Sequence, residues 1–242
     1  SGALLLVPAM VPASDSSKPV FRLHLFSEPT SLSPFVQKNS NSTYFLSQLS
    51  CPLLRWNGKE LEPWGAVCRS KKKTTIECEI DENLKFNDGT PVLASNYLES
   101  FKAFFNPASP GPRADLLLSI KNAGAVLKRE KPVSDLGIKA EGRRLIFELE
   151  TEDADFLSRL AYPLFTAVTS ATIPPPSEFK QFKSCGPYQL SGWVPGQRVQ
   201  LIPNPHFPKG HPDRPHLEFI FVPVDSLALQ YYQKGELDFL RR

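Results

Sequence analysis

The sequence predicts a mixed α/β fold, and three observations support this prediction. Segments in which apolar and polar residues alternate, as they do in strands, are interleaved with segments whose apolar residues recur at helical spacing. The 24 prolines divide the chain into short elements and argue against a helical bundle. With 242 residues, 41% of them hydrophobic and 22% charged, the chain has the composition of an ordinary globular protein.

The first half of the chain contains five predicted elements. Apolar residues alternate with Arg22 and His24 in the first strand, Pro52 ends the first helix, and a run of three lysines marks the turn of the first hairpin. In chain order, the pattern predicts a strand at 21–26, a helix at 43–54, a hairpin at 68–80, a short strand at 84–86 and a helix at 95–105.

The second half of the chain alternates in the same way between helices and strands. Three consecutive prolines within 172–178 indicate the strongest linker of the chain, and Gly235 is the expected C-cap of the last helix. The pattern predicts helices at 114–127, 153–160 and 226–234, a hairpin at 137–149, two strands at 186–190 and 199–202, and further strands at 217–224 and 236–240.

The N-terminal residues suggest where the protein acts. Residues 3–10 are apolar but too few to span a bilayer. Small residues up to Ala13 followed by the polar stretch 14–17 are typical of the end of a signal peptide. We therefore expect 1–18 to be a signal-peptide remnant, or else a flexible arm, and the protein to be exported to the periplasm or the cell surface.

Five motifs follow one another in a recognisable order. They are SEPTSLSP at 27–34, FNDGTPVLA at 86–94, CGPYQL at 185–190, NP at 204–205 and GELD at 235–238. In this order they resemble the bacterial extracellular solute-binding proteins, which include the dipeptide-, oligopeptide- and nickel-binding proteins of ABC transporters. Two positions depart from the family pattern, since Cys185 stands where Thr is usual and Ser33 stands where Asp is usual.

The resemblance implies an architecture. It predicts the N-terminal half of such a receptor, a periplasmic-binding-protein-like lobe with a mixed sheet and an inserted α+β subdomain, and with the second lobe absent. On this layout 19–48 together with 171–242 form the first-lobe α/β subdomain, and 49–170 form the inserted subdomain.

The resemblance also suggests ligand-binding residues. Glu28, with its neighbours Pro29 and Thr30, aligns with an acidic cleft residue of oligopeptide-binding relatives, where a carboxylate attracts cationic groups. The alternative is an ordinary surface glutamate. In the loop 109–115 the relatives present an aromatic residue to the ligand, whereas this chain offers Arg113 and Asp115, which favours a polar or charged ligand.

The four cysteines contain no C-x-x-C pair, which argues against a zinc ribbon or a thioredoxin-like site. Cys68 and Cys78 flank the lysine turn of the hairpin nearly symmetrically, so we expect a disulfide between them in an exported protein. His206, His211 and His216 recur every five residues, but an ordinary connecting loop is the preferred interpretation there, and no metal site is predicted.

The expected function is capture of a solute, most simply a peptide, for an ABC importer. No hydrolase triad or phosphate-binding motif is present, so neither an enzyme nor a cofactor is predicted. The formal net charge of +3 is too small to indicate nucleic-acid binding. The expected partners are a small peptide or other polar solute, the transporter permease, and a second lobe or partner chain. The alternative is a ligand-sensing or protein-interaction domain on the same fold, without a transport role.

Overall fold

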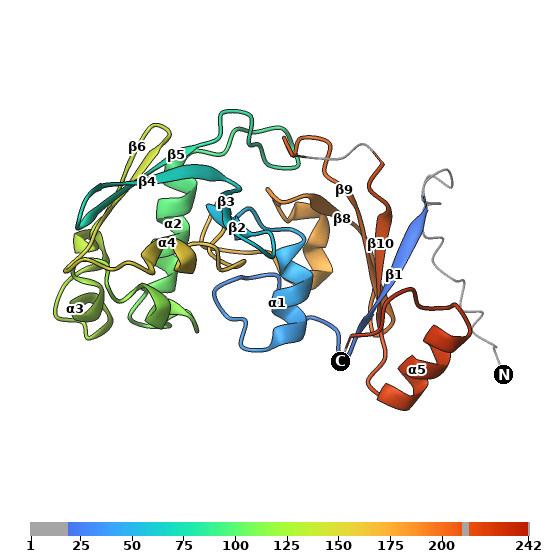
Figure 1. Ribbon diagram of the computed structural model, residues 1–242. Coiled ribbons are helices and arrows are strands. Elements are labelled where there is room, and N and C mark those ends of the chain that lie inside the picture. Colours follow the sequence, from blue (N-terminus) through green and yellow to red (C-terminus); the bar gives the residue numbers. More distant parts are fainter. Residues whose placement is uncertain (1–18, 210–212, 242) are drawn as a thin grey trace.

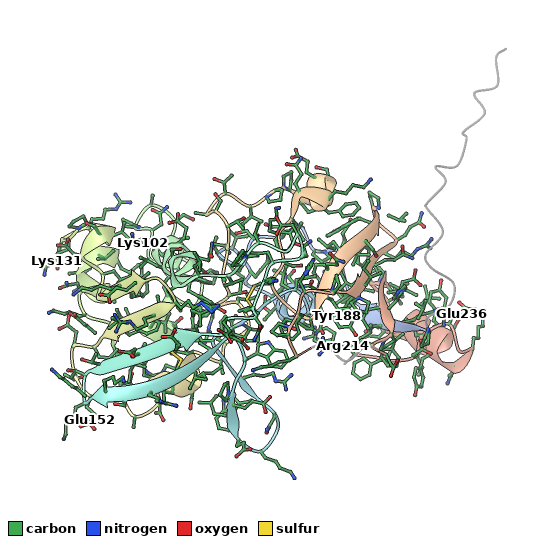
Figure 2. The ribbon with its side chains drawn as sticks, turned by 90° about the horizontal axis from the view of Figure 1, so that it is seen from above. Lys102, Lys131, Glu152, Tyr188, Arg214 and Glu236 are labelled. Carbon is green, nitrogen blue, oxygen red and sulfur yellow. A yellow bond between two sulfur atoms is a disulfide. The ribbon has the colours of Figure 1, made fainter. Side chains whose placement is uncertain are left out.

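The computed structural model describes residues 19–209 and 213–241 (Figure 1). The predicted signal-peptide remnant at 1–18 and His211 lie outside the described residues. The two sheets occupy opposite parts of the molecule, with α1 (Ser40–Ser47) between them. Seen from above, Lys131 and Glu152 lie toward one end of the molecule and Glu236 toward the other (Figure 2).

The first sheet joins the two ends of the described chain. Its order is β1 (Val20–Leu25), β10 (His216–Phe221), β9 (Arg198–Pro203) and β8 (Tyr188–Val194). β1 runs parallel to β10, and the other pairs are antiparallel, so the sheet is mixed as expected. α5 (Asp225–Gln233) follows β10, and the segment after it returns along β1, where His24 N donates to the Phe239 carbonyl at 3.1 Å.

The second sheet is antiparallel throughout. Its order is β4 (Ala66–Lys72), β5 (Thr75–Ile80), β7 (Arg144–Glu148) and β6 (Ile138–Glu141), and a small ribbon of β2 (Leu54–Trp56) and β3 (Leu61–Pro63) precedes it. α2 (Ala94–Phe104) lies against this sheet and buries Tyr97, Phe101 and Phe104. The two sheets fall within the predicted subdomains, whose limits at 48/49 and 170/171 stay a prediction.

The remaining helices are short. They are the α-helices α3 (Ala123–Leu127) and α4 (Phe156–Arg159) and the 3-10 turns η1 (Ala114–Leu117), η2 (Val133–Asp135) and η3 (Pro176–Gln181). None of the helices in residues 19–209 and 213–241 has both the length and the apolar character to cross a membrane.

Two predicted helices differ from the structure for the same reason. The helix expected at 114–127 is interrupted, because Ile120 forms a bridge with Leu149 beside the second sheet. The helix expected at 43–54 ends at Ser47, because the carbonyls of Gln48 and Leu49 accept hydrogen bonds from Tyr188 N and Gly186 N instead of continuing the helix. In both places backbone partners distant in sequence replace local helical bonds.

One buried apolar cluster extends through both sheets. It includes Phe45 and Phe219 at the first sheet and Phe101 and Phe147 at the second, in edge-to-face pairs with ring centroids 5.4 Å and 5.3 Å apart. Such pairs contribute about 0.5–1.5 kcal/mol beyond their buried area. The two parts of the chain therefore share one core.

A disulfide that the sequence reasoning did not predict lies where these two parts meet. Cys51 and Cys185 are joined, with Cα atoms 5.4 Å apart, and both are buried. Around it, the Tyr97 hydroxyl donates to the Cys51 carbonyl at 2.6 Å, and the Thr166 hydroxyl accepts from Cys51 N at 2.9 Å. We call this region, formed by residues 48–52, Tyr97, Thr166 and 184–188, the seam.

Cys68 and Cys78 are also joined, as the sequence predicted. They are directly paired residues of β4 and β5, with Cα atoms 4.0 Å apart. The structure therefore places all four cysteines in disulfides, one at the seam and one within the hairpin.

Candidate functional site

A cavity of about 560 Å³ opens beside α1. Its walls come from four separate parts of the chain: residues of 37–47, the two short stretches 112–113 and 162–163, and Arg241. It thus lies between the part that carries the first sheet and the part that carries the second. We call it the α1 cavity.

The loop that leads into α1 is fixed by a buried amide. The side chain of Gln37 donates to the carbonyls of Ser31 and Ser33 at 3.0 Å and 2.9 Å. Asn39 then caps α1 by accepting from Ser42 N at 2.8 Å, a bond that satisfies one of the orphan donors of the first turn. The start of α1 is therefore fixed both by the Gln37 amide and by the Asn39 cap.

Tyr44 forms the aromatic part of the cavity wall. Its ring packs edge-to-face against Phe219, with centroids 5.9 Å apart. Burial raises the pKa of the Tyr44 phenol, although the positive charge of Arg241 acts in the opposite direction. The phenol is therefore neutral near pH 7 and can donate a hydrogen bond.

Arg241 lies over Tyr44. Its guanidinium carbon is 4.6 Å from the ring centroid, and Nη1 donates to the Ser40 carbonyl at 3.0 Å. The preceding segment is tied to β1, since Arg22 N donates to the Asp238 carboxylate at 2.7 Å. Within the described residues, Arg241 forms no ion pair with a carboxylate.

Arg113 lines the cavity from a different part of the chain. Its guanidinium carbon is 5.8 Å from the Tyr162 ring centroid, and its Nε is 4.0 Å from a carboxylate oxygen of Asp115, the outer limit of an ion pair. Both charged side chains are about half exposed, which makes the pair weak. Arg113 lines the cavity and Asp115 does not.

Glu28 has a different environment from the one expected of a ligand-binding residue. Its carboxylate accepts from Trp193 Nε1 at 2.6 Å and from Gly196 N at 2.8 Å. These bonds tie the loop after β1 to the β8–β9 turn. Pro29 is buried and Thr30 is exposed, and none of the three residues lines the α1 cavity with Arg113. Their ligand role stays a prediction.

Sequence reasoning missed Lys38, Tyr44 and Arg241. Tyr44 resembled one more apolar residue of a helix, and nothing local indicated that Arg241 lies beside it. The available signal was the polar run 37–43 at the start of a helix, directly after a loop that the family motif already singled out.

A second cavity of about 560 Å³ adjoins the first and shares Ser40 and Arg241 with it. Its other walls include the apolar side chains of Phe26, Leu229 and Leu240. Arg241 thus lies between a cavity whose charged lining residues are all cationic and a second cavity that also contains the carboxylate of Asp225.

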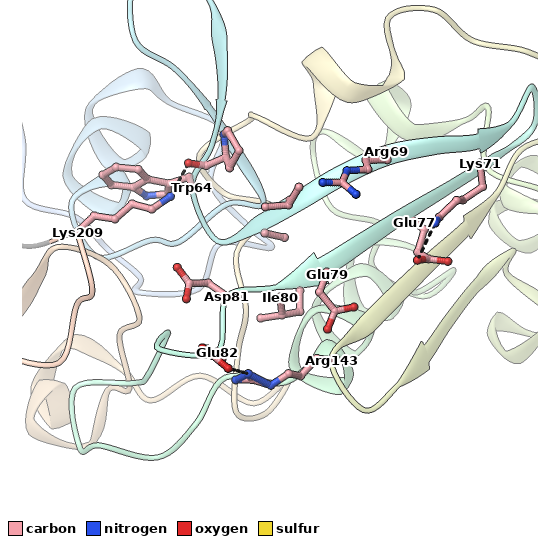
Figure 3. Close-up of a pocket in the computed structure, with 13 residues that line it drawn as sticks. Trp64, Arg69, Lys71, Glu77, Glu79, Ile80, Asp81, Glu82, Arg143 and Lys209 are labelled. Carbon is pink, nitrogen blue, oxygen red and sulfur yellow. Dashed lines mark hydrogen bonds and ion pairs between the residues drawn. The ribbon is translucent and has the colours of Figure 1, made fainter.

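A hollow of about 500 Å³ lies elsewhere, along the exposed side of the β4–β5 hairpin (Figure 3). We call it the hairpin groove. It is charged but balanced, with four basic and four acidic lining residues, of which Lys71 pairs with Glu77 at 3.6 Å and Arg143 with Glu82 at 3.9 Å. An excess of one charge is therefore a property of the α1 cavity and not of the groove.

The sequence is similar to known proteins over most of its length. Residues 60–242 match the bacterial extracellular solute-binding proteins, family 5, middle part. The chain is 24% identical over 193 residues to the periplasmic oligopeptide-binding protein OppA of Salmonella typhimurium, covering 76% of this chain and 33% of that protein. It is 26% identical over 236 residues to the dipeptide-binding protein DppE of Bacillus subtilis, covering 93% of this chain and 43% of that protein.

Solved structures show the same fold. The murein tripeptide binding protein MppA of Escherichia coli matches with a TM-score of 0.82 at 24% identity, over 92% of this chain and 45% of that one. OppA of Burkholderia pseudomallei matches with a TM-score of 0.82 at 21% identity, over 93% and 46%. The chain therefore spans between a third and just under half of the length of these relatives.

Proposed function

This chain belongs to the bacterial extracellular solute-binding proteins of family 5, and we propose that it forms the first lobe of a receptor that captures peptides for an ABC importer. Proteins of this family bind solutes and are not enzymes. The observation that supports the proposal most directly is the α1 cavity, because four distant segments of a solute-binding fold converge there. Concave sites with a few convergent polar groups are typical of small-ligand binding.

Peptides are the proposed ligands because of the relatives. OppA of Salmonella typhimurium is named for oligopeptides, DppE for dipeptides and MppA for murein tripeptides. The α1 cavity suits a small peptide, since aromatic surface from Tyr44 and Tyr162 lies beside polar side chains that can bond to peptide groups.

Export is part of the proposal. Curated relatives such as OppA are periplasmic, and two disulfides are consistent with an oxidising compartment. A permease is the proposed partner of the loaded receptor.

Since the chain corresponds to less than half of its relatives, we propose that it binds peptides only weakly by itself. Receptors of this kind bury the ligand between two lobes, and one lobe leaves a face of the ligand in water. It also lacks the closed state that a ligand would stabilise.

Titration of the 242-residue chain with mixed di- to pentapeptides, followed by calorimetry and by NMR chemical shifts, tests the proposal. We expect a Kd of roughly 1 to 10 mM, with shifts concentrated at Tyr44, Arg113 and Tyr162. Micromolar or tighter binding would contradict the single-lobe part of the proposal. Shifts confined to the hairpin groove would contradict the location of the site.

A further inference from the structure

We infer that the α1 cavity recognises a carboxylate of its ligand through Lys38, Arg113 and Arg241, so that acidic peptides are preferred. This inference rests on the proposed function, and it names the ligand class of the same site. It predicts which peptides the site discriminates.

The charge of the cavity lining favours an anionic ligand. Three of the residues that line the α1 cavity are cationic, and none carries a carboxylate. The nearest acid to Arg113 is Asp115 at 4.0 Å, which lies outside the lining. Within the described residues, neither Lys38 nor Arg241 has an ion-pair partner. An anionic ligand would meet three cations there and no competing acid.

The orientation of the two guanidinium groups suits a carboxylate. Arg241 is held over the Tyr44 ring, and one of its N–H groups donates to the Ser40 carbonyl. Its other N–H groups remain for a ligand. Arg113 lies near the Tyr162 ring. A planar guanidinium placed against an aromatic ring is already oriented, and its fork matches the two oxygens of a carboxylate.

The groups around these cations suit a ligand that carries both a carboxylate and an apolar part. Because burial raises its pKa, the Tyr44 phenol stays neutral and does not repel a carboxylate. The compartment on the other side of Arg241 is lined by Phe26, Leu229 and Leu240, which offer apolar contacts to the rest of a ligand, but also by Asp225, whose carboxylate would repel an anion. A ligand that joins an anionic group to an apolar part would therefore place the anionic group in the α1 cavity and the apolar part in the second cavity.

The hairpin groove shows that this excess of positive charge is local. The groove has as many acidic as basic lining residues, and several of them are paired. The whole chain carries a formal net charge of only +3. A general basic character of the surface therefore does not explain the α1 cavity.

The inference is tested with the tripeptides Ala-Glu-Ala, Ala-Gln-Ala and Ala-Lys-Ala, each with a free and an amidated C-terminus. NMR titration of the 242-residue chain should show the Glu peptide binding roughly 5- to 20-fold more tightly than the Gln peptide at low salt. The difference should shrink at about 1 M salt, where charges are screened within about 3 Å. Amidation shows whether the terminal carboxylate contributes as well as the side chain.

Two variants locate the effect. In Arg113→Gln/Arg241→Gln the preference for Glu over Gln should disappear. In the matched control Lys71→Gln/Arg143→Gln, which removes two cations from the hairpin groove, the preference should remain. Far-UV circular dichroism verifies that both variants are folded. Lys38→Gln changes an exposed side chain, and it should by itself weaken the preference for the Glu peptide over the Gln peptide.

The outcomes separate this inference from the proposed function. Equal binding of the Glu and Gln peptides, tighter binding of the Lys peptide, or a preference that survives in the double variant would overturn the inference and leave the peptide receptor standing. If no peptide binds at about 10 mM, the proposed function fails, and glutarate then tests the cavity alone. Glutarate shifts at Arg113 and Tyr44 that the double variant abolishes would support the inference, and their absence would overturn it.

Discussion

The seam and the β4–β5 hairpin both combine a disulfide with a nearby charged hollow, but the residues that form them are separated by very different distances in sequence. Each contains a disulfide, but Cys51 and Cys185 are 134 residues apart, whereas Cys68 and Cys78 are 10 residues apart. Each lies near a charged hollow, but the α1 cavity needs four distant parts of the chain, whereas the hairpin groove is formed largely by one hairpin.

The difference in charge pairing follows from this construction. Strand residues that are neighbours in a hairpin can neutralise each other locally, as Lys71 and Glu77 do. Arg113 and Arg241 are brought together only by the fold, and no acid accompanies either into the cavity. We therefore expect changes in the regions built by long-range contacts to affect stability and binding more than matched changes in the hairpin.

Removal of a disulfide should have the largest effect on the stability of the protein. Cys51→Ala/Cys185→Ala should lower the free energy of unfolding by about 5 kcal/mol, and Cys68→Ala/Cys78→Ala by about 3 kcal/mol, because a crosslink that closes a longer loop restricts the unfolded chain more. Urea unfolding monitored by tryptophan fluorescence measures both losses.

Equal losses of stability in the two double variants would contradict the expectation that the crosslink across the longer loop contributes more. A thiol count of the unfolded, non-reduced protein provides a separate check, since two intact disulfides leave no reactive thiol. Four reactive thiols would show that neither disulfide forms.

The next effect concerns close backbone approach at the seam. A methyl group on Gly186 would lie 2.4 Å from the Leu49 carbonyl carbon and 2.5 Å from Ser50 N. Gly186→Ala should therefore destabilise by about 1–3 kcal/mol, because backbone atoms must shift. Gly124→Ala is the control, since that position in α3 has open space and Ala should stabilise it by about 0.5–1 kcal/mol. Thermal unfolding compares the stability of the two variants. A Gly186→Ala variant as stable as the original chain would show that the backbone of the seam can shift without cost.

A smaller effect is expected at Tyr97. Its buried hydroxyl donates to the Cys51 carbonyl at 2.6 Å. Tyr97→Phe should cost about 1–2 kcal/mol, because it leaves that buried carbonyl without the hydroxyl. Tyr232→Phe, at an exposed position of α5, should change stability by less than about 0.5 kcal/mol. Chemical denaturation that gives equal values for the two variants would contradict a special role of the seam.

The smallest effect concerns an exposed ion pair. Lys183 donates to Asp88, and this bond, together with the Thr90 side chain, holds the pKa of the Asp88 carboxyl well below its usual range. A lowered pKa stabilises the fold above about pH 4, the ordinary value for Asp, and this stabilisation is lost as the pH falls through the folded-state pKa. Solvent screening limits it to less than about 1 kcal/mol.

The test compares the original chain with Asp88→Asn. Their difference in free energy of unfolding should be largest near neutral pH and should shrink between about pH 4 and pH 2. Glu77→Gln, which removes the pair with Lys71 inside the hairpin, should change stability even less, because the Lys71 side chain is about half exposed and stays solvated without its partner. A difference between the original chain and Asp88→Asn that grows on acidification would contradict the assignment.

Local patterns were sufficient for the mixed α/β class, for the β4–β5 hairpin with its Cys68–Cys78 disulfide, and for the helix at 94–104. Each depends on residues a few positions apart, whose alternation or helical spacing is visible in the chain. The ordered motifs also identified the family. Cys185, which stands where the family usually has Thr, was the only visible hint of the second disulfide.

Tertiary structure alone decided the end of α1 at Ser47, the break at Ile120, the internal partners of Glu28 and the meeting of Arg241 with Tyr44. In each case the deciding partner lies far away in sequence, so no local periodicity could indicate it. Backbone groups and charges must find partners somewhere, and the folded chain determines which distant ones are within reach.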